Sequence, residues 1–177
     1  MTATYDSAMP TLTTAPTRTG YTFAGYFDAQ SNGTKYYNAD KSSARAWDKT
    51  SATTLYAHWT AVEYTVTYNT DGGSAKTALK FTRESTSTLG TASGKTGYTF
   101  NNWKVTATAG NWTAVDTTYA STKSLSGMYG NVTLKAQWTV NSYNYKVTVY
   151  MKATNTTTAE QTIEETPISE KTMYVNY

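Results

Sequence analysis

The sequence predicts a β-rich chain, α+β at most, built from tandem units of just under 80 residues. Thr occurs 39 times among the 177 residues, together with 16 Tyr and 5 Trp. Residues that are branched or bulky at Cβ fit a pleated strand better than a helix. Two sequence motifs also recur in the same order, and apolar residues alternate within them, which indicates strands repeated along the chain.

The repeat is defined by two pairs of matching segments. Thr19–Phe23 returns as Thr96–Phe100, 77 positions later, and Thr54–Thr60 returns as Thr133–Thr139, 79 positions later. Self-similarity at a fixed period is typical of tandem structural units. We therefore expect an incomplete first repeat at 1–60 that lacks its opening strand, a complete second repeat at 61–139, and the start of a third, related surface repeat at 140–177.

The elements of a whole unit can be followed in the second copy. Alternation and turn residues predict an opening strand at Tyr64–Tyr68, a turn at Asp71–Gly73, a second strand near Leu79–Arg83, a strand after Gly97, a variable stretch from about Val105 to Leu125, and a closing strand at Val132–Trp138. In the first copy, the stretch from Ser31 to Ser51 is compatible with a short helical turn. After the second copy, Tyr145–Tyr150 resembles a new opening strand, and Met173–Val175 is a candidate for the strand that follows it.

The two copies indicate which side chains face the core. In the closing segment every second residue is unchanged between the copies, whereas Tyr56 and His58 become Lys135 and Gln137. Successive side chains of a strand point to opposite faces, so the unchanged set faces inward. With the matching aromatic motif, the predicted core comprises Tyr21, Phe23, Leu55, Ala57, Trp59, Tyr98, Phe100, Leu134, Ala136 and Trp138.

One matched pair breaks this alternation. Tyr26 corresponds to Trp103 in the second copy, but both lie on the opposite parity from the preceding Tyr and Phe. A β-bulge inserts one residue and restores the face. We therefore expect a bulge or bend near Gly25 and Asn102.

The motifs resemble those of a known family. The segment from Pro16 to Tyr26 follows the pattern Pro-Thr-x-x-Gly-Tyr-x-Phe-x-Gly-Trp, with Tyr26 in place of Trp, and Thr54–Thr60 contains Leu-Tyr-Ala-x-Trp. The second copy follows the same patterns, except that Asn102 replaces Gly and Lys135 replaces Tyr. This pattern is similar to the Listeria–Bacteroides repeat, the B-repeat of internalin-type surface proteins. The resemblance implies a β-grasp-like fold, tandem arrangement in secreted or wall-anchored bacterial proteins, and no catalytic residues. Residues 140–177 are more loosely similar to mucin-binding-type modules.

Composition excludes several other classes. The net charge is +3, only 15% of residues are charged, and Lys and Arg are scattered, so nucleic acid is not an expected partner. Cysteine is absent, which excludes disulfides and thiolate metal sites. No apolar run reaches membrane-spanning length in this segment. The low charge and the resemblance together favour an extracellular or cell-surface fragment of a larger secreted protein.

Candidate catalytic groups are few. His58 is the only histidine, lies on the solvent parity of its strand and is Gln137 in the other copy, so we expect an exposed surface residue. Asp71 precedes two glycines, which favours a turn over a calcium ligand, although both remain open. Glu164 and Glu165 are adjacent and would face opposite sides of a strand. We therefore predict no enzyme activity, no metal site and no cofactor.

Exposed aromatics offer the one binding hypothesis. Four lie in the variable segments between the paired motifs: Tyr36, Tyr37, Trp47 and Trp112. Amphipathic aromatic rings dominate recognition surfaces, and sugar rings stack on them. The alternative is that the same rings close the small core of each unit. A host or cell-wall glycan or protein is the partner that the first interpretation implies.

These observations favour a non-catalytic structural or adhesive segment, a stalk or spacer, of a bacterial surface protein. A glycan- or protein-binding module is the alternative. A further possibility follows from the opening strand that the first copy lacks, because an open sheet edge accepts a strand from another chain. The spare strand Tyr145–Tyr150 has a suitable pattern, which would give head-to-tail self-association into filaments.

Overall fold

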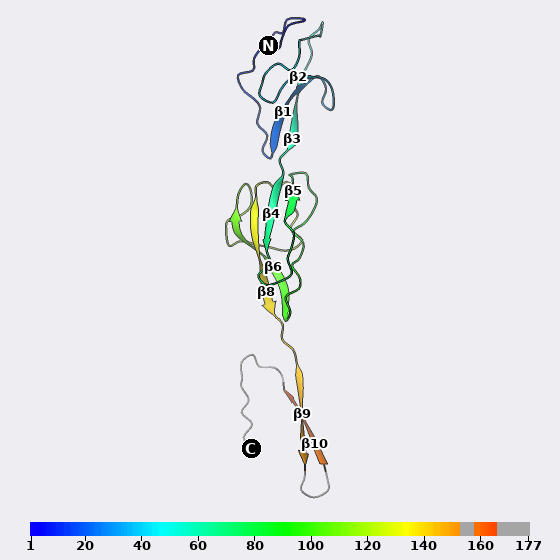
Figure 1. Cartoon of the computed structure of the whole chain (residues 1–177), viewed down its shortest axis with the longest axis vertical. Helices are drawn as coiled ribbons and strands as arrows, with labels where there is room; N and C mark the ends of the chain where they lie inside the picture. The colour runs from blue at the N-terminus through cyan, green and yellow to red at the C-terminus, as the bar shows by residue number, and fades with distance from the viewer. Residues whose placement is uncertain (153–157, 166–177) are drawn as a thin grey trace.

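The computed structural model describes residues 1–152 and 158–165, of which 146–152 and 158–165 are described by their backbone alone. These residues form ten strands in three sheets that follow one another along the molecule (Figure 1). No helix occurs among the described residues, including the stretch 31–51. The prediction of a β-rich chain is confirmed, and what is described is all-β.

The first sheet has three antiparallel strands. They are β1 (Tyr21–Phe27), β2 (Lys35–Tyr37) and β3 (Tyr56–Ala61), in the order β2-β1-β3. The preceding residues meet this unit through two single bridges to the loop before β3, Tyr5 to Trp47 and Ala8 to Ala46. In the order β2-β1-β3, β3 is an edge strand of its sheet.

The second sheet has five strands in the order β5-β4-β8-β6-β7. Its strands are β4 (Tyr64–Asn69), β5 (Leu79–Phe81), β6 (Tyr98–Thr108), β7 (Thr118–Tyr119) and β8 (Val132–Val140). β4 pairs in parallel with β8, and the other neighbours are antiparallel. β8 thus lies at the centre, with a strand on each side. The finer description as β-grasp-like stays a prediction.

The expected bulges are present in both copies. The register of β1 against β3 shifts between Phe23 and Gly25, and that of β6 against β8 shifts between Phe100 and Asn102. The predictions at Gly25 and Asn102 are confirmed. The bulge is what brings Trp103 into the core, where its ring is fully buried.

The core of the second sheet is large and closed. Trp103 is buried at its centre and donates a hydrogen bond from Nε1 to the Gly90 carbonyl at 2.7 Å. Tyr68 of β4 packs on its ring at 4.7 Å between centroids and donates its hydroxyl to the Leu89 carbonyl at 2.8 Å. The buried members of this cluster are Val66, Phe81, Leu89, Ala92, Trp103, Val105, Trp112, Leu125, Met128, Val132, Leu134 and Ala136.

The core of the first sheet is small. Met9, Tyr36 and Tyr37 form its buried cluster, around which the packed side chains are partly exposed, and Phe23 of β1 is buried as well. β1 has one strand on each side, and in the described residues no strands that correspond to β4 and β5 extend the sheet beyond β3. A sheet with fewer strands buries less apolar surface on folding.

The third sheet is a two-stranded hairpin of β9 (Tyr145–Lys152) and β10 (Thr158–Glu165), paired antiparallel over their full length. β9 matches the strand expected at Tyr145–Tyr150. The strand suggested at Met173–Val175 lies outside the described residues.

Candidate functional site

The predicted core positions differ in burial, and those near the centre of a sheet are the most buried. Leu134 and Ala136 have no exposed surface, and Phe23 is 8% exposed. Partly buried positions at the margins of the two cores are Leu55, Ala57, Trp59, Phe100 and Trp138. Tyr98 differs from expectation, with 42% of its surface exposed, because it begins β6 opposite Val140, beyond the end of the core. Tyr21 occupies the same place on β1, opposite Ala61.

The four aromatics considered for ligand binding lie in or beside the cores. Tyr36, Tyr37 and Trp112 are 0%, 4% and 6% exposed. Tyr36 packs on Trp47 at 5.1 Å between centroids and contacts the Asp48 carboxylate through its hydroxyl. Three of the four rings have no free face on which a sugar could stack, and Trp47 keeps part of its surface exposed.

A cleft lies beside the first sheet. Its volume is about 660 Å³, and its wall includes the rings of Tyr26, Tyr37 and Trp47 and the side chain of Leu55. The wall is completed by the N-terminal residues 1–3, by the segment 49–53 that leads into β3, and by Met9, Pro10 and Leu12. The wall mixes apolar side chains with the hydroxyl groups of Thr50, Ser51 and Thr53, and the cleft lies beside the rings of β1 and β2 and the segment before β3.

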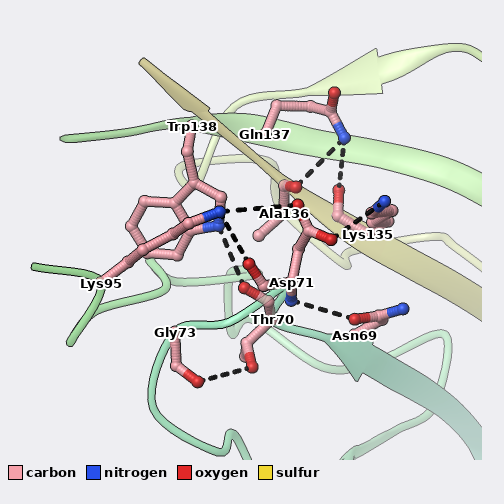
Figure 2. Close-up of polar contacts among 9 residues, drawn as sticks. All are labelled: Asn69, Thr70, Asp71, Gly73, Lys95, Lys135, Ala136, Gln137 and Trp138. Atoms are coloured by element: carbon pink, nitrogen blue, oxygen red, sulfur yellow. Dashed lines mark hydrogen bonds and ion pairs between the residues drawn. The ribbon is translucent and has the colours of Figure 1, made fainter. Parts of the chain in front are cut away.

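The Asp71 turn is held by charge (Figure 2). Asp71 lies in the left-handed region at φ 50°, and its amide donates to Asn69 Oδ1 at 3.0 Å. Its carboxylate pairs with Lys135 at 3.0 Å and with Lys95 at 3.7 Å, and Lys95 also donates to the Asp71 carbonyl at 2.8 Å. The hydrogen bond from Lys135 is the main cause that holds the pKa of Asp71 below its usual value.

Two ammonium groups at one carboxylate favour the turn interpretation of Asp71 and disfavour a calcium ligand, since they already neutralise its charge. Trp138 completes the arrangement by donating from Nε1 to the Thr70 carbonyl at 3.0 Å, so the end of β8 is tied to the turn after β4 (Figure 2). No group of three potential metal ligands is found in residues 1–152 and 158–165. The same residues contain no helix that could cross a membrane.

His58 differs from expectation. It is half-buried, its ring is stacked on Phe27 at 3.9 Å between centroids, and its Nε2 lies 2.8 Å from the Ala29 carbonyl. As expected, His58 points away from the core side of its strand. The other side of this small sheet is not open to solvent, however, because Phe27 and the turn after β1 cover it. These contacts give His58 a structural role, in which it holds the turn after β1 against the outer face of the first sheet.

Contacts between the first two sheets were not anticipated from sequence. Arg83 donates from Nη1 to the Thr19 carbonyl at 2.9 Å, and the Tyr21 hydroxyl donates to Glu84 at 2.8 Å. Arg83 also lies directly over Gly20, where an added Cβ would meet its Cδ at 2.3 Å. These pairs are more than 60 positions apart in the chain, so no local pattern in the sequence indicates them.

These features define a class: an all-β tandem repeat segment with aromatic cores and tied turns. The chain belongs to the Listeria-Bacteroides repeat domain family, whose model matches residues 1–58 and 64–137. Internalin H of Listeria monocytogenes is 40% identical over 129 residues, which are 72% of this chain and 21% of that protein. The chain therefore spans about a fifth of the length of this relative. No solved structure matches the chain.

Proposed function

We propose that this chain is a non-catalytic structural spacer segment of a bacterial secreted or cell-surface protein, divided into units at 1–60, 61–139 and 140–177. Membership of a repeat-domain family and the similarity to part of an internalin support the proposal. A spacer has to transmit position along its length, and this requires junctions that resist bending.

The observation that carries the proposal is the tied junction between β3 and β4. Only Val62 and Glu63 separate these strands, and the Val62 amide donates to the Gly20 carbonyl at 3.0 Å. The contacts of Arg83 and Tyr21 lie beside this link. A two-residue connection leaves few torsions free, and a hydrogen bond from a charged group fixes them more strongly than a neutral one.

The experiment uses the absence of cysteine in the chain. Gln30→Cys and Ala114→Cys place one spin label on an exposed position of each of the first two units. A rigid junction gives a narrow distribution of label-to-label distances in pulsed electron resonance. Measurement at high dilution confines the result to geometry within one chain.

Arg83→Ala is the test variant, and Lys76→Ala is its matched control, because it also removes one positive charge but lies over Tyr68, away from the junction. We expect the distance distribution to broaden with Arg83→Ala and to stay narrow with Lys76→Ala. A broad distribution in the unmodified chain contradicts the spacer proposal.

A further inference from the structure

The chain enters and leaves the second sheet at opposite ends (Figure 1). It enters β4 directly after Glu63 and leaves β8 after Val140. These two strands are neighbours and run parallel, with Val66 opposite Val132 at the start of their shared ladder. The start of β4 and the end of β8 therefore lie far apart along the strand direction, although the two strands are hydrogen-bonded to each other.

This arrangement decides how tension along the chain acts on the sheet. A pull on the start of one parallel strand and on the end of its neighbour draws the two strands past each other along their own axes. The backbone hydrogen bonds lie across the strands and are evenly spaced, so they carry the load together. If the entering and leaving strands were antiparallel, the two pulled ends would lie side by side, and the bonds would open one after another.

Side chains extend the pairing beyond both ends of the ladder. The ladder joins residues 66–69 to residues 132–135. Before it, the Thr65 amide donates to Asn131 Oδ1 at 2.9 Å. Beyond it, Trp138 donates from Nε1 to the Thr70 carbonyl at 3.0 Å (Figure 2). Strands that slide past each other have to break these two bonds as well as the ladder.

The ladder is also shielded from water on its core side. Val66, Val132 and Leu134 are 0%, 2% and 0% exposed, and β8 has β6 as its second neighbour. Water competes for backbone hydrogen bonds, and such bonds are stronger where the local dielectric constant is low. The interior position of the ladder therefore raises the barrier to sliding.

We propose that the paired segments 65–70 and 131–138 form a force-bearing clamp, which keeps the second unit folded while tension acts along the chain. This role rests on the proposed spacer function, because a spacer between a cell surface and an attached object transmits tension. It adds a distinct property to that function. Rigid junctions set the position of each unit, whereas the clamp sets the rate at which one unit unfolds under load. Forced unfolding depends on this rate rather than on the free energy of unfolding.

The first test compares two directions of pull on the same folded chain. Cysteine is absent from the sequence, so pairs of introduced cysteines define where the handles of a single-molecule force measurement attach. Glu63→Cys with Ser142→Cys loads opposite ends of the clamp. Glu63→Cys with Thr108→Cys is the matched control, because Thr108 lies opposite Val132 and so places both handles at one end of the sheet. All three replaced residues are exposed.

We expect the unfolding force at a fixed pulling speed to be several-fold higher for the first pair of handles than for the second. The melting temperatures of the two double variants should be alike, since neither pair replaces a buried residue. Equal unfolding forces in the two directions, or a higher force in the control direction, overturn the proposal.

A pair of asparagine variants tests where the load is carried. Asn131→Ala removes the acceptor of the Thr65 amide. Asn111→Ala is the matched control, because Asn111 is also exposed and its Oδ1 accepts the Tyr129 amide at 2.9 Å, in the loop between β6 and β7 outside the clamp. With handles at positions 63 and 142, we expect Asn131→Ala to lower the unfolding force and Asn111→Ala to leave it unchanged. An equal fall in both variants, or no fall with Asn131→Ala, overturns the proposal.

A pair of tryptophan variants tests the other end of the clamp. Trp138→Phe keeps an aromatic ring but removes the donor to the Thr70 carbonyl. Trp112→Phe is the control, because it removes an Nε1 donor that bonds the Gly130 carbonyl at 2.9 Å, from a ring that is only 6% exposed. We expect Trp112→Phe to lower the melting temperature more and Trp138→Phe to lower the unfolding force more. An unfolding force that follows the melting temperature in both variants contradicts the clamp.

The outcome is separable from that of the spacer proposal. The distance distribution between the first two units reports the junction at 62–63 and is measured without load, whereas the unfolding force reports the second unit. A narrow distribution with equal forces in the two directions leaves the spacer and removes the clamp. A broad distribution with a higher force along the chain removes the rigid spacer and leaves the clamp as a mechanical property of the sheet.

Discussion

The two copies of the repeat carry the same motifs on sheets of different size. Phe23, Tyr26 and Trp59 of the first copy form a chain of contacting rings, and Phe100, Trp103 and Trp138 form the matching chain in the second. Among the residues that the structure describes, only the second copy has a parallel strand beyond its closing strand. The difference shows that the motifs build the antiparallel pair by themselves, whereas β4 and β5 close the core over it.

The closing strands show what that additional pair contributes. Ala136 of β8 has no exposed surface, but its counterpart Ala57 on β3 is partly exposed. Burial of apolar area is the main favourable term in folding. We therefore expect the second unit to be the more stable of the two, and each prediction below breaks or sharpens this comparison.

The largest expected effect is at the matched leucines. Leu134→Ala leaves a cavity in a closed core and should lower the free energy of unfolding of the second unit by about 2–5 kcal/mol. Leu55→Ala, at the wall of the open cleft, should cost roughly 1 kcal/mol. Hydrogen exchange of the β8 and β3 amides in denaturant measures each unit separately. Equal losses of unfolding free energy in the two variants would show that the two cores do not differ in how tightly they pack these leucines.

The bulges give the next effect. Gly25 has φ 131°, and an added Cβ would lie 2.2 Å from the Tyr37 carbonyl, whereas Asn102 occupies the matching position without a positive φ. Gly25→Asn should destabilise the first unit by about 1–3 kcal/mol through backbone strain. Asn102→Ala should change the second by less than about 0.5 kcal/mol, since its buried Oδ1 has no hydrogen-bond partner. Thermal melting of both variants checks this asymmetry.

Alanine substitutions at the two glycines of the repeated Thr-Gly-Tyr motif should differ only in their effect on the junction between the first two units. Gly20 and Gly97 have similar positive φ values of 81° and 78°, so an alanine at either costs about 1 kcal/mol of strain. A Cβ at Gly20 also meets Arg83, while one at Gly97 meets nothing within 4 Å. Gly20→Ala should therefore broaden the distance distribution between the first two units, and Gly97→Ala should leave it narrow.

The smallest effect concerns pH. Ion pairing lowers the pKa of Asp71 in the folded second unit, and Lys49 with the Thr34 amide lowers that of Asp28 in the first. A depressed carboxyl pKa contributes stability above the unfolded value of about 3.9, and this is lost as pH falls through the folded value. Melting temperatures of both units should decrease as the solution is acidified below that range.

Asp71→Asn should flatten the decrease for the second unit and leave that of the first unchanged. Asp28→Asn should do the reverse. Melts recorded between neutral and strongly acid pH, followed unit by unit through amide exchange, measure both slopes. Identical slopes in the variants and the unmodified chain would show that these pairs do not contribute.

Much of the fold was predictable because it is local. Alternation within Val132–Trp138 indicated the strand and its inward face, and the parity break before Trp103 indicated the bulge. Both follow from the period of two in a strand, which a single sequence displays directly. The failures lie at strand ends: Tyr98 has the motif of a core residue but begins β6 beyond the core.

The departures from the family pattern became interpretable only with the fold. Lys135 stands where the first copy has Tyr56, and the structure shows why a cation suits that place: the Asp71 carboxylate lies 3.0 Å from its ammonium group. The first copy has no equivalent turn beside Tyr56 in the described residues. Sequence comparison of the copies records the exchange but not its partner, which lies 64 positions away.

By itself the sequence determined the strand composition, the repeat, the inward face of the closing strands and the position of the bulges, because each depends on neighbours along the chain. The tertiary structure decided that Tyr36 and Trp112 pack in the cores, how Arg83 contacts the first unit, and which strands lie beside β8. Those outcomes depend on residues brought together from distant positions, where burial and charge pairing, rather than periodicity, control the free energy.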